Sequence, residues 1–278
     1  MNTLFVSDLD GTLLRMDQTV SPYTLNTINH LMTQGVHFTY ATARSFVSAS
    51  KVTQGLQLTL PVIVYNGAII VDPTNGQVLE SYLLSKTALM PVLMAIKQLQ
   101  LRLLVYAMVE GRERVSWIMG EENVSIQAYL DNRQEDPRLR PVHTYEELFA
   151  GDLFYLTVLG SRVDMEAVRP AFTKSAYLHT HLVEDTYRLG EYWLEGYRHD
   201  ATKAEAVAKV RRLAGAERLV CFGDNINDIP MFDVSDACYA VANAKPELKA
   251  MATQVIGSHE ADGVAEWLAA WWAKKYGA

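Results

Sequence analysis

Two short apolar runs in this chain each end in a cluster of aspartates, and this repeated pattern limits the folds that the chain can adopt. The run LFVS at residues 4–7 precedes DLDGT at residues 8–12, and RLVCF at residues 218–222 precedes the second acidic cluster, GDNIND. Apolar runs of this length are typical of buried strands, and glycine permits a sharp turn after each strand. We therefore predict two buried strands whose carboxyl ends carry acidic side chains.

Each acidic cluster also has a simpler interpretation. A strand can end in a solvated turn, and an aspartate near a helix start can cap that helix. However, capping explains one aspartate, whereas the second cluster holds Asp224 and Asp228 together with two asparagines. The whole DLDGT pattern is expected by accident in only roughly a few chains per thousand. Because Mg²⁺ prefers a few carboxylates and keeps water and phosphate oxygens as its other ligands, the two clusters predict a hard-cation site.

Four motifs of the chain together resemble those of the haloacid dehalogenase superfamily, and specifically its Cof-type phosphatases with a C2-type α/β cap. The first motif is DLDGT, the second is Thr42 within YATAR, the third is Lys203 within DATKAEA, and the fourth is GDNINDIPM. They follow one another in the family's order. The resemblance implies an α/β fold class, with a Rossmann-like core in which a parallel sheet has helices on both faces, and with an inserted α/β cap domain.

The resemblance also implies a magnesium-dependent phosphomonoester hydrolase that forms an aspartyl phosphate. Asp8 would be the catalytic nucleophile, and Asp10 would protonate the leaving oxygen and then activate water. The metal ligands would be Asp8, the Asp10 carbonyl and Asp224, with Asp228 supporting the metal indirectly. Lys203 would supply catalytic positive charge. The residues that would bind the substrate phosphate are Thr42, Ala43, Arg44, Lys203 and Asn227.

Several of these residues have ordinary interpretations when they are taken alone. A threonine before a helix, such as Thr42, is usually a cap, and a lysine in a helical run, such as Lys203, is usually solvated. Ala43 stands where the family commonly has glycine. The backbone tolerates the alanine methyl group at this position if φ stays negative. The closely spaced pair His179 and His181 lacks the partners of a zinc signature. Two rival functions remain open: a phosphotransferase or sugar phosphomutase, and a non-catalytic phospho-ligand sensor.

Strands and helices alternate in both terminal thirds, which is the pattern of a parallel sheet covered by helices. We predict a discontinuous core at residues 1–82 and 190–278, and an inserted cap that determines substrate specificity at residues 83–189. The resemblance to the family implies that this cap is an open-faced antiparallel sheet covered by two helices. Further expected elements are a helix after Ser21-Pro22 that ends before Gly35, a helix at 45–54, a helix from Ser85, a helix at 262–275, strands at 36–41 and 61–65, and a hairpin at 68–71 and 77–84.

Composition narrows the classes of partner. The chain has 278 residues, 49% of them hydrophobic, and a formal net charge of −7, which disfavours nucleic-acid binding. No apolar run approaches 18 residues, so we expect no membrane span. Cys221 and Cys238 lie in apolar runs and are expected to be buried free thiols of a reducing compartment. We therefore predict a cytoplasmic enzyme that acts on small phosphorylated metabolites, with sugar phosphates as the expected substrates. We expect it to be a monomer or weak homodimer without nucleic-acid or membrane partners.

Overall fold

The computed structural model describes residues 2–185 and 188–277, and it divides into two compact units. The core unit comprises Met1–Ser81 and Thr202–Ala278, and the inserted unit comprises Tyr82–Ala201. The second boundary of the inserted unit lies after Ala201, twelve residues beyond the predicted one at residue 189. The difference arises because strand β11 (Tyr192–Arg198) pairs with both β10 (Leu178–Glu184) and β9 (Asp152–Gly160) of the inserted unit.

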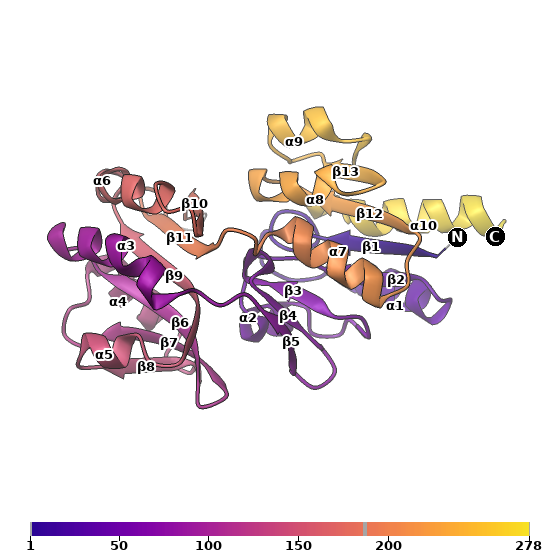
Figure 1. Ribbon diagram of the computed structural model, residues 1–278. Helices are drawn as coiled ribbons and strands as arrows, with labels where there is room; N and C mark the ends of the chain where they lie inside the picture. Colours follow the sequence, from indigo (N-terminus) through magenta and orange to yellow (C-terminus); the bar gives the residue numbers. More distant parts are fainter. Residues whose placement is uncertain (1, 186–187, 278) are drawn as a thin grey trace. The chain divides into compact units, whose positions relative to one another are not determined.

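The main sheet of the core unit is parallel and has the strand order β14-β13-β12-β1-β2 (Figure 1). The chain adds β2 on one side of β1 and β13 and β14 on the other side of β12, so the winding reverses between β1 and β12. In open α/β sheets, ligands bind outside the carboxyl ends of the strands at such a reversal. These five strands are β1 (Thr3–Ser7), β2 (His37–Tyr40), β12 (Arg218–Gly223), β13 (Ala237–Val241) and β14 (Gln254–Ile256).

A second, antiparallel sheet of three short strands completes the β-structure of the core unit. Its first strand lies beside the residue that follows β2, because Ala41 and Ile63 form an isolated parallel β-bridge. The hairpin predicted at residues 68–71 and 77–84 forms its other two strands. The three strands are β3 (Val62–Val64), β4 (Ile69–Val71) and β5 (Val78–Ser81), with the 3₁₀ turn η1 (Tyr65–Gly67) between β3 and β4.

Helices cover the main sheet, and every residue of β1 is buried. The first helix begins as predicted, because Ser21 accepts a hydrogen bond from the Thr24 amide and Pro22 occupies the first turn. The last helix packs on the sheet through Trp267 and Trp271, whose rings contact Phe5. The helices are α1 (Pro22–Thr33), α2 (Phe46–Val52), α7 (Lys203–Leu213), α8 (Ile229–Asp233), α9 (Pro246–Met251) and α10 (Gly263–Tyr276), with 3₁₀ turns η2 (Ile226–Asp228) and η3 (His259–Ala261).

The inserted unit is built on one six-stranded sheet with the order β10-β11-β9-β6-β7-β8. It is mixed rather than purely antiparallel, because β7 and β8 run parallel. Its apolar core joins α3 and α6 to one face of the sheet, through residues such as Val92, Phe172 and Leu156. The remaining elements are β6 (Leu103–Val109), β7 (Arg112–Ile118), β8 (Leu139–Val142), α3 (Lys86–Gln98), α4 (Val124–Asp131), α5 (Tyr145–Leu148) and α6 (Arg162–Thr173).

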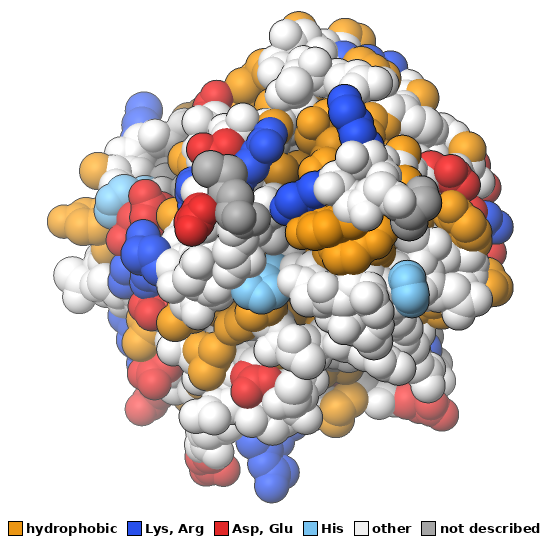
Figure 2. All heavy atoms as spheres, turned by 90° about the vertical axis from the view of Figure 1, so that its right-hand side faces the viewer, with side chains coloured by type: hydrophobic (Ala, Val, Ile, Leu, Met, Phe, Trp, Pro, Cys, Tyr) orange, Lys and Arg blue, Asp and Glu red, His pale blue; other side chains and the backbone are white. Residues whose placement is uncertain are grey.

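The fold-class prediction, an α/β core with a parallel sheet, is confirmed. Cys221 and Cys238 are both buried free thiols, as expected. Side chains of both charge signs are interspersed on the face shown in Figure 2. Among the residues that the structure describes, no helix is long and apolar enough to cross a membrane.

Candidate active site

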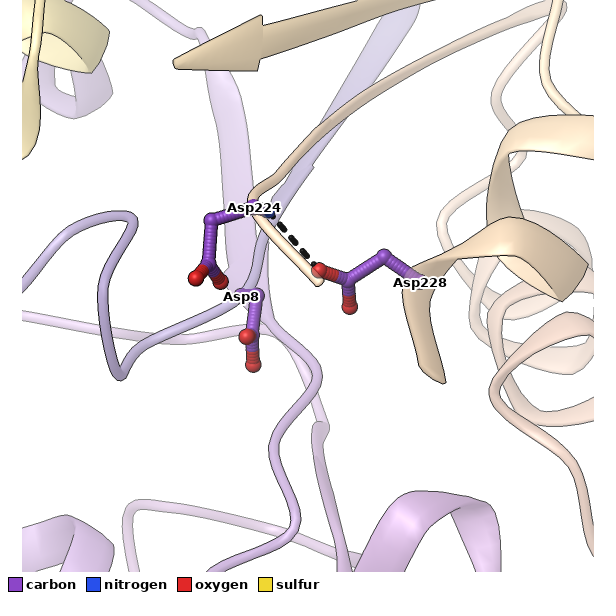
Figure 3. Close-up of side chains that lie close together, drawn as sticks. All are labelled: Asp8, Asp224 and Asp228. Atoms are coloured by element: carbon purple, nitrogen blue, oxygen red, sulfur yellow. Dashed lines mark hydrogen bonds between the residues drawn. The ribbon is translucent and has the colours of Figure 1, made fainter. Parts of the chain in front are cut away.

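The two predicted acidic clusters meet at the carboxyl ends of β1 and β12. These strands are direct neighbours, and the Asp8 amide continues their pairing by donating to the Phe222 carbonyl at 3.0 Å. Carboxylate oxygens of Asp8, Asp224 and Asp228 lie within 4.8 Å of one another. Figure 3 shows the Asp8 and Asp224 side chains beside each other, with Asp228 approaching from the helical side. The topology of the sheet therefore gathers three carboxylates from two distant parts of the chain.

Lys203 lies inside this acidic cluster. Its ammonium donates to Asp8 Oδ1 at 2.9 Å and to Asp228 Oδ1 at 2.7 Å, and the residue is only 2% exposed. It occupies the first turn of α7, after the capping residue Thr202. The start of α7 packs closely against Gly67, where a side chain would not fit, since a Cβ atom there would lie 2.3 Å from the Thr202 carbonyl oxygen. Lys203 is thus a buried ion-pair partner and not a solvated helix residue.

Asp228 is fully buried, and its carboxylate is used within the protein. One oxygen pairs with Lys203, and the other accepts hydrogen bonds from the Asp224 amide at 2.9 Å and the Asn225 amide at 3.1 Å. These bonds fix the turn that carries Asp224. Asp228 therefore orients Lys203 and the backbone that carries Asp224.

The cluster holds more negative than positive charge. Burial, and then repulsion by Asp228, raises the pKa of Asp8 well above its usual range, and the attraction of Lys203 does not offset them. Burial and the Asp228 charge likewise raise the pKa of Asp224. For Lys203, burial opposes the charged form, but the carboxylates of Asp228 and Asp8 raise the pKa overall. One ammonium cannot balance three carboxylates in a poorly solvated site.

This surplus charge and the all-oxygen donor set fit a divalent hard cation. The Asp8 and Asp224 carboxylates are the candidate side-chain ligands, because Asp228 is already occupied by protein partners. Thr12 donates to Asp224 Oδ1 at 3.1 Å and so orients that carboxylate. Oxygen ligands of this kind suit Mg²⁺, and the donor set contains none of the sulfur or imidazole groups typical of zinc sites.

Thr42 and Ala43 follow the end of β2, on the other side of β1. Thr42 is fully buried, and its hydroxyl oxygen accepts a hydrogen bond from the Arg44 amide at 3.1 Å. Within residues 2–185 and 188–277, the Ala43 amide has no hydrogen-bond partner, and Ala43 is not among the residues with positive φ. The methyl group at this position therefore imposes no backbone strain, and the amide is available to an acceptor.

Arg44, which the sequence predicts to bind the substrate phosphate, contacts Asp10 in this structure. Its guanidinium binds the Asp10 carboxylate through two hydrogen bonds, Nε to Oδ2 at 2.7 Å and Nη2 to Oδ1 at 2.5 Å. Nη2 also donates to Gln18 at 2.8 Å. The Asp10 side chain is 46% exposed, so it is the most accessible acidic group of the DLDGT motif. Arg44 thus fixes the direction of the Asp10 carboxylate.

Asn227 lies on η2, and its amide donates to Asn66 Oδ1 at 3.2 Å. Asn66 was not assigned a role from the sequence, although it directly follows the strand predicted at residues 61–65. Thr12 and Gln18 were also missed as partners of Asp224 and Arg44. Thr12 belongs to the first motif, so its position was a usable signal, whereas nothing in the sequence marks Gln18.

The family model for haloacid dehalogenase-like hydrolases matches residues 5–268. A 5-amino-6-(5-phospho-D-ribitylamino)uracil phosphatase of Bacillus subtilis is 27% identical, over 95% of this chain and 96% of that protein. A pyridoxal phosphate phosphatase of Escherichia coli is 25% identical, over 94% of this chain and 95% of that protein.

A solved structure supports the same relationship at the level of the fold. The crystal structure of a haloacid dehalogenase-like hydrolase from Bacteroides thetaiotaomicron superposes with a TM-score of 0.81 and 19% identity, covering 97% of this chain and 99% of that one. The match of the family model over nearly the whole chain includes both acidic clusters, Thr42 and Lys203. The chain belongs to the haloacid dehalogenase-like hydrolase family, and it is an enzyme of the phosphatase type.

Proposed function

We propose that the enzyme hydrolyses phosphomonoesters of small metabolites, in a magnesium-dependent reaction through an aspartyl phosphate at Asp8. The observation that carries the proposal is the cluster of Asp8, Asp224 and Asp228 around Lys203 at the reversal point of the sheet. The three carboxylates carry more negative charge than the single ammonium of Lys203 can neutralise. This surplus suits a site that binds a cation together with a phosphate.

In the first step, one Asp8 carboxylate oxygen attacks phosphorus, and the bond from phosphorus to the ester oxygen breaks. Asp10 donates its proton to the departing oxygen, which leaves as an alcohol. In the second step, Asp10 takes a proton from water, the resulting hydroxide attacks phosphorus, and the bond to Asp8 breaks. Inorganic phosphate leaves, and both aspartates return to their starting states.

The remaining residues stabilise the transferring phosphoryl group. Lys203 offers a fixed positive charge beside Asp8, and the Ala43 amide and the Thr42 hydroxyl can donate to phosphate oxygens. Asn227 is a further candidate donor. Mg²⁺ held by Asp8, the Asp10 carbonyl and Asp224 would neutralise charge on the phosphoryl oxygens. Arg44 orients Asp10 in this proposal, and its predicted contact with the substrate phosphate stays a prediction.

We assign substrate selection to the inserted unit, which has its own sheet and apolar core and can therefore act as a folded cap domain. The two phosphatase relatives are named for 5-amino-6-(5-phospho-D-ribitylamino)uracil and for pyridoxal phosphate, both of them small molecules. By analogy, we propose a small soluble phosphomonoester, with sugar phosphates first among the candidates. The two free cysteines agree with our assignment of the enzyme to the reducing cytoplasm.

The test is release of inorganic phosphate from a panel of sugar phosphates, nucleotides and pyridoxal phosphate, with a phosphopeptide at equal concentration. We expect the small esters to be hydrolysed far better than the phosphopeptide. A preference for the phosphopeptide would contradict the proposed substrate class. Transfer of phosphate to a second sugar without its release would indicate a phosphotransferase or mutase, and binding without turnover would indicate a sensor.

A further inference from the structure

We propose that Asn243 is a positioning residue that fixes the metal side of the active site through the backbone of Gly11. The inference rests on the proposed function, because it concerns the same magnesium site. Asn243 follows β13 and lies at the surface, outside the cluster of aspartates. None of the four motifs contains it.

The Asn243 side chain bridges two segments that are far apart in the sequence. Its amide nitrogen donates to the Gly11 carbonyl at 2.7 Å, and its oxygen accepts from the His259 amide at 3.1 Å. Both partners are backbone groups. The side chain therefore holds the turn after β1 against the segment that leads into α10.

Gly11 is a position that needs such support. Its φ is +74°, and a Cβ atom there would lie 2.5 Å from Asp224 Oδ2, so both the conformation and the close contact favour glycine. Glycine has more conformational freedom to lose than any other residue. The peptide on one side of Gly11 carries the Asp10 carbonyl, which is the proposed metal ligand, and the peptide on the other side carries the carbonyl that Asn243 binds. Holding the second peptide restricts the direction of the first.

Other contacts anchor the same loop further along the chain. Arg15 donates to Asp262 at 2.7 Å, and the Met16 amide donates to Glu260 at 2.6 Å. Both partners belong to the segment around η3 that Asn243 also binds through His259. The Asn243 bond is the one of these three nearest in sequence to Asp8 and Asp10, so its loss should loosen the metal ligands more than the loop as a whole.

The chain offers a matched control in Asn29 of α1. Its amide nitrogen donates to the Gly55 carbonyl at 2.8 Å, and its oxygen accepts from the Gln57 amide at 2.9 Å. Asn29 thus makes the same pair of backbone bonds in the same unit, but it ties down a loop that contains no proposed ligand. Asn243→Ala and Asn29→Ala remove equivalent bonds, and only the first should affect the metal.

The experiment is calorimetric titration of the full-length protein with MgCl₂ in phosphate-free buffer, with thermal unfolding of the same samples. We expect Asn243→Ala to weaken Mg²⁺ binding by about tenfold, within the range known for residues that orient metal ligands. Asn29→Ala should leave the affinity within about twofold of wild type, because it is an independent site. The two melting temperatures should fall by similar amounts.

Equal Mg²⁺ affinities for wild type and Asn243→Ala would overturn the inference and leave the proposed function intact. A wild-type protein that binds no Mg²⁺ would overturn both. If Asn243→Ala does not fold, Asn243→Asp carries the test, since it keeps the acceptor for His259 but loses the donor to Gly11. The added negative charge alone would strengthen Mg²⁺ binding, so weaker binding by this variant supports positioning, and unchanged or stronger binding contradicts it.

Discussion

The core unit and the inserted unit each contain a buried cation between two carboxylates, and the two clusters differ in their balance of charge. In the core unit, Lys203 pairs with Asp8 and Asp228. In the inserted unit, Arg138 pairs with Glu113 at 2.6 Å and Asp136 at 2.5 Å, and its side chain is 6% exposed. Both clusters exclude most water, so burial alone does not distinguish a structural ion cluster from a catalytic one.

The pKa directions of the carboxylates are what separate the two clusters. Burial opposes the charged form of Asp136, but hydrogen bonds from Arg138 lower its pKa overall. The pKa of Asp8 is raised, because burial and repulsion by neighbouring aspartates outweigh Lys203. The Arg138 cluster is therefore satisfied by its own residues, whereas the Lys203 cluster is poised to take up further positive charge.

Replacing one carboxylate in each cluster should give the largest contrast in activity. Asp8→Asn removes the nucleophile, so we expect phosphate release to fall by about 10⁴-fold or more while the protein stays folded. Asp136→Asn should change turnover by no more than about twofold, since Asp136 is not one of the proposed site residues. Steady-state phosphate release by both purified variants provides the measurement, and substantial turnover by folded Asp8→Asn protein would remove Asp8 from its assigned role.

Removing the cation from each cluster should separate catalysis from stability. Lys203→Met should lower kcat by about 10²- to 10³-fold, because a fixed charge beside the phosphoryl group is lost. Arg138→Met should leave kcat nearly unchanged but reduce the free energy of unfolding by about 3–5 kcal/mol, as expected when a buried ion pair loses one partner. Denaturant unfolding and kcat are measured on the same preparations. Equal loss of kcat in both variants would erase the distinction between the clusters.

In protein freed of metal by chelation, the two clusters should contribute to the free energy of unfolding with opposite dependence on pH. The raised pKa values of Asp8 and Asp224 mean that the folded chain holds their protons more tightly than the unfolded chain, so stability falls as pH rises above the ordinary carboxyl range. The lowered pKa of Asp136 contributes stability above that range, and this contribution is lost as pH falls through the folded-state value.

Replacing one aspartate of each cluster by the neutral asparagine tests this difference through the free energy of unfolding. In metal-free protein at pH 8, Asp224→Asn should raise the free energy of unfolding by about 1 kcal/mol or more, and the gain should shrink at pH 5. Asp136→Asn should lower the free energy of unfolding at pH 8 by about 1.5–3 kcal/mol, through its lost bonds to Arg138. Urea unfolding at the two pH values gives both numbers. Destabilisation by Asp224→Asn under these conditions would argue against surplus charge at the site.

The smallest effect concerns the two-pronged pairing of Arg44 with Asp10. Arg44→Lys cannot reproduce this geometry, so we expect kcat to fall by about tenfold for esters with poor leaving groups, which depend on Asp10 as an acid. For p-nitrophenyl phosphate, whose leaving group needs little protonation, the loss should be smaller. Arg198 makes a similar two-pronged pair with Asp200 in the inserted unit, and Arg198→Lys is the control. An equal loss for both kinds of ester would contradict the orienting role of Arg44.

Local features of the sequence predicted much of the fold. The apolar run before Asp8 and the cap at Ser21 and Pro22 specified β1 and the start of α1, because both depend on neighbouring residues. The end of the inserted unit was harder to predict. The partly polar strand β11 belongs there only through its pairing with β9 and β10, which composition does not reveal.

The candidate site was predictable where motifs carried it and less so where partners are distant. Lys203 reads locally as an exposed helix residue, and its burial depends on contacts with Asp8, 195 residues away. The pairing of Arg44 with Asp10 joins two motifs that the sequence analysis treated separately. Asn243 contacts Gly11 across 232 residues, and a single asparagine gives no signal of that bond.

The most direct test of the proposed metal site is phosphate release from a small phosphomonoester by wild-type enzyme, with Mg²⁺ and after exhaustive chelation. Asp136→Asn is measured in parallel. The surplus negative charge around Lys203 predicts that wild type and Asp136→Asn are both active with Mg²⁺, that both lose activity on chelation, and that added Mg²⁺ restores both. Full activity of the chelated wild-type enzyme would contradict the proposal that this cluster works only with a bound divalent cation.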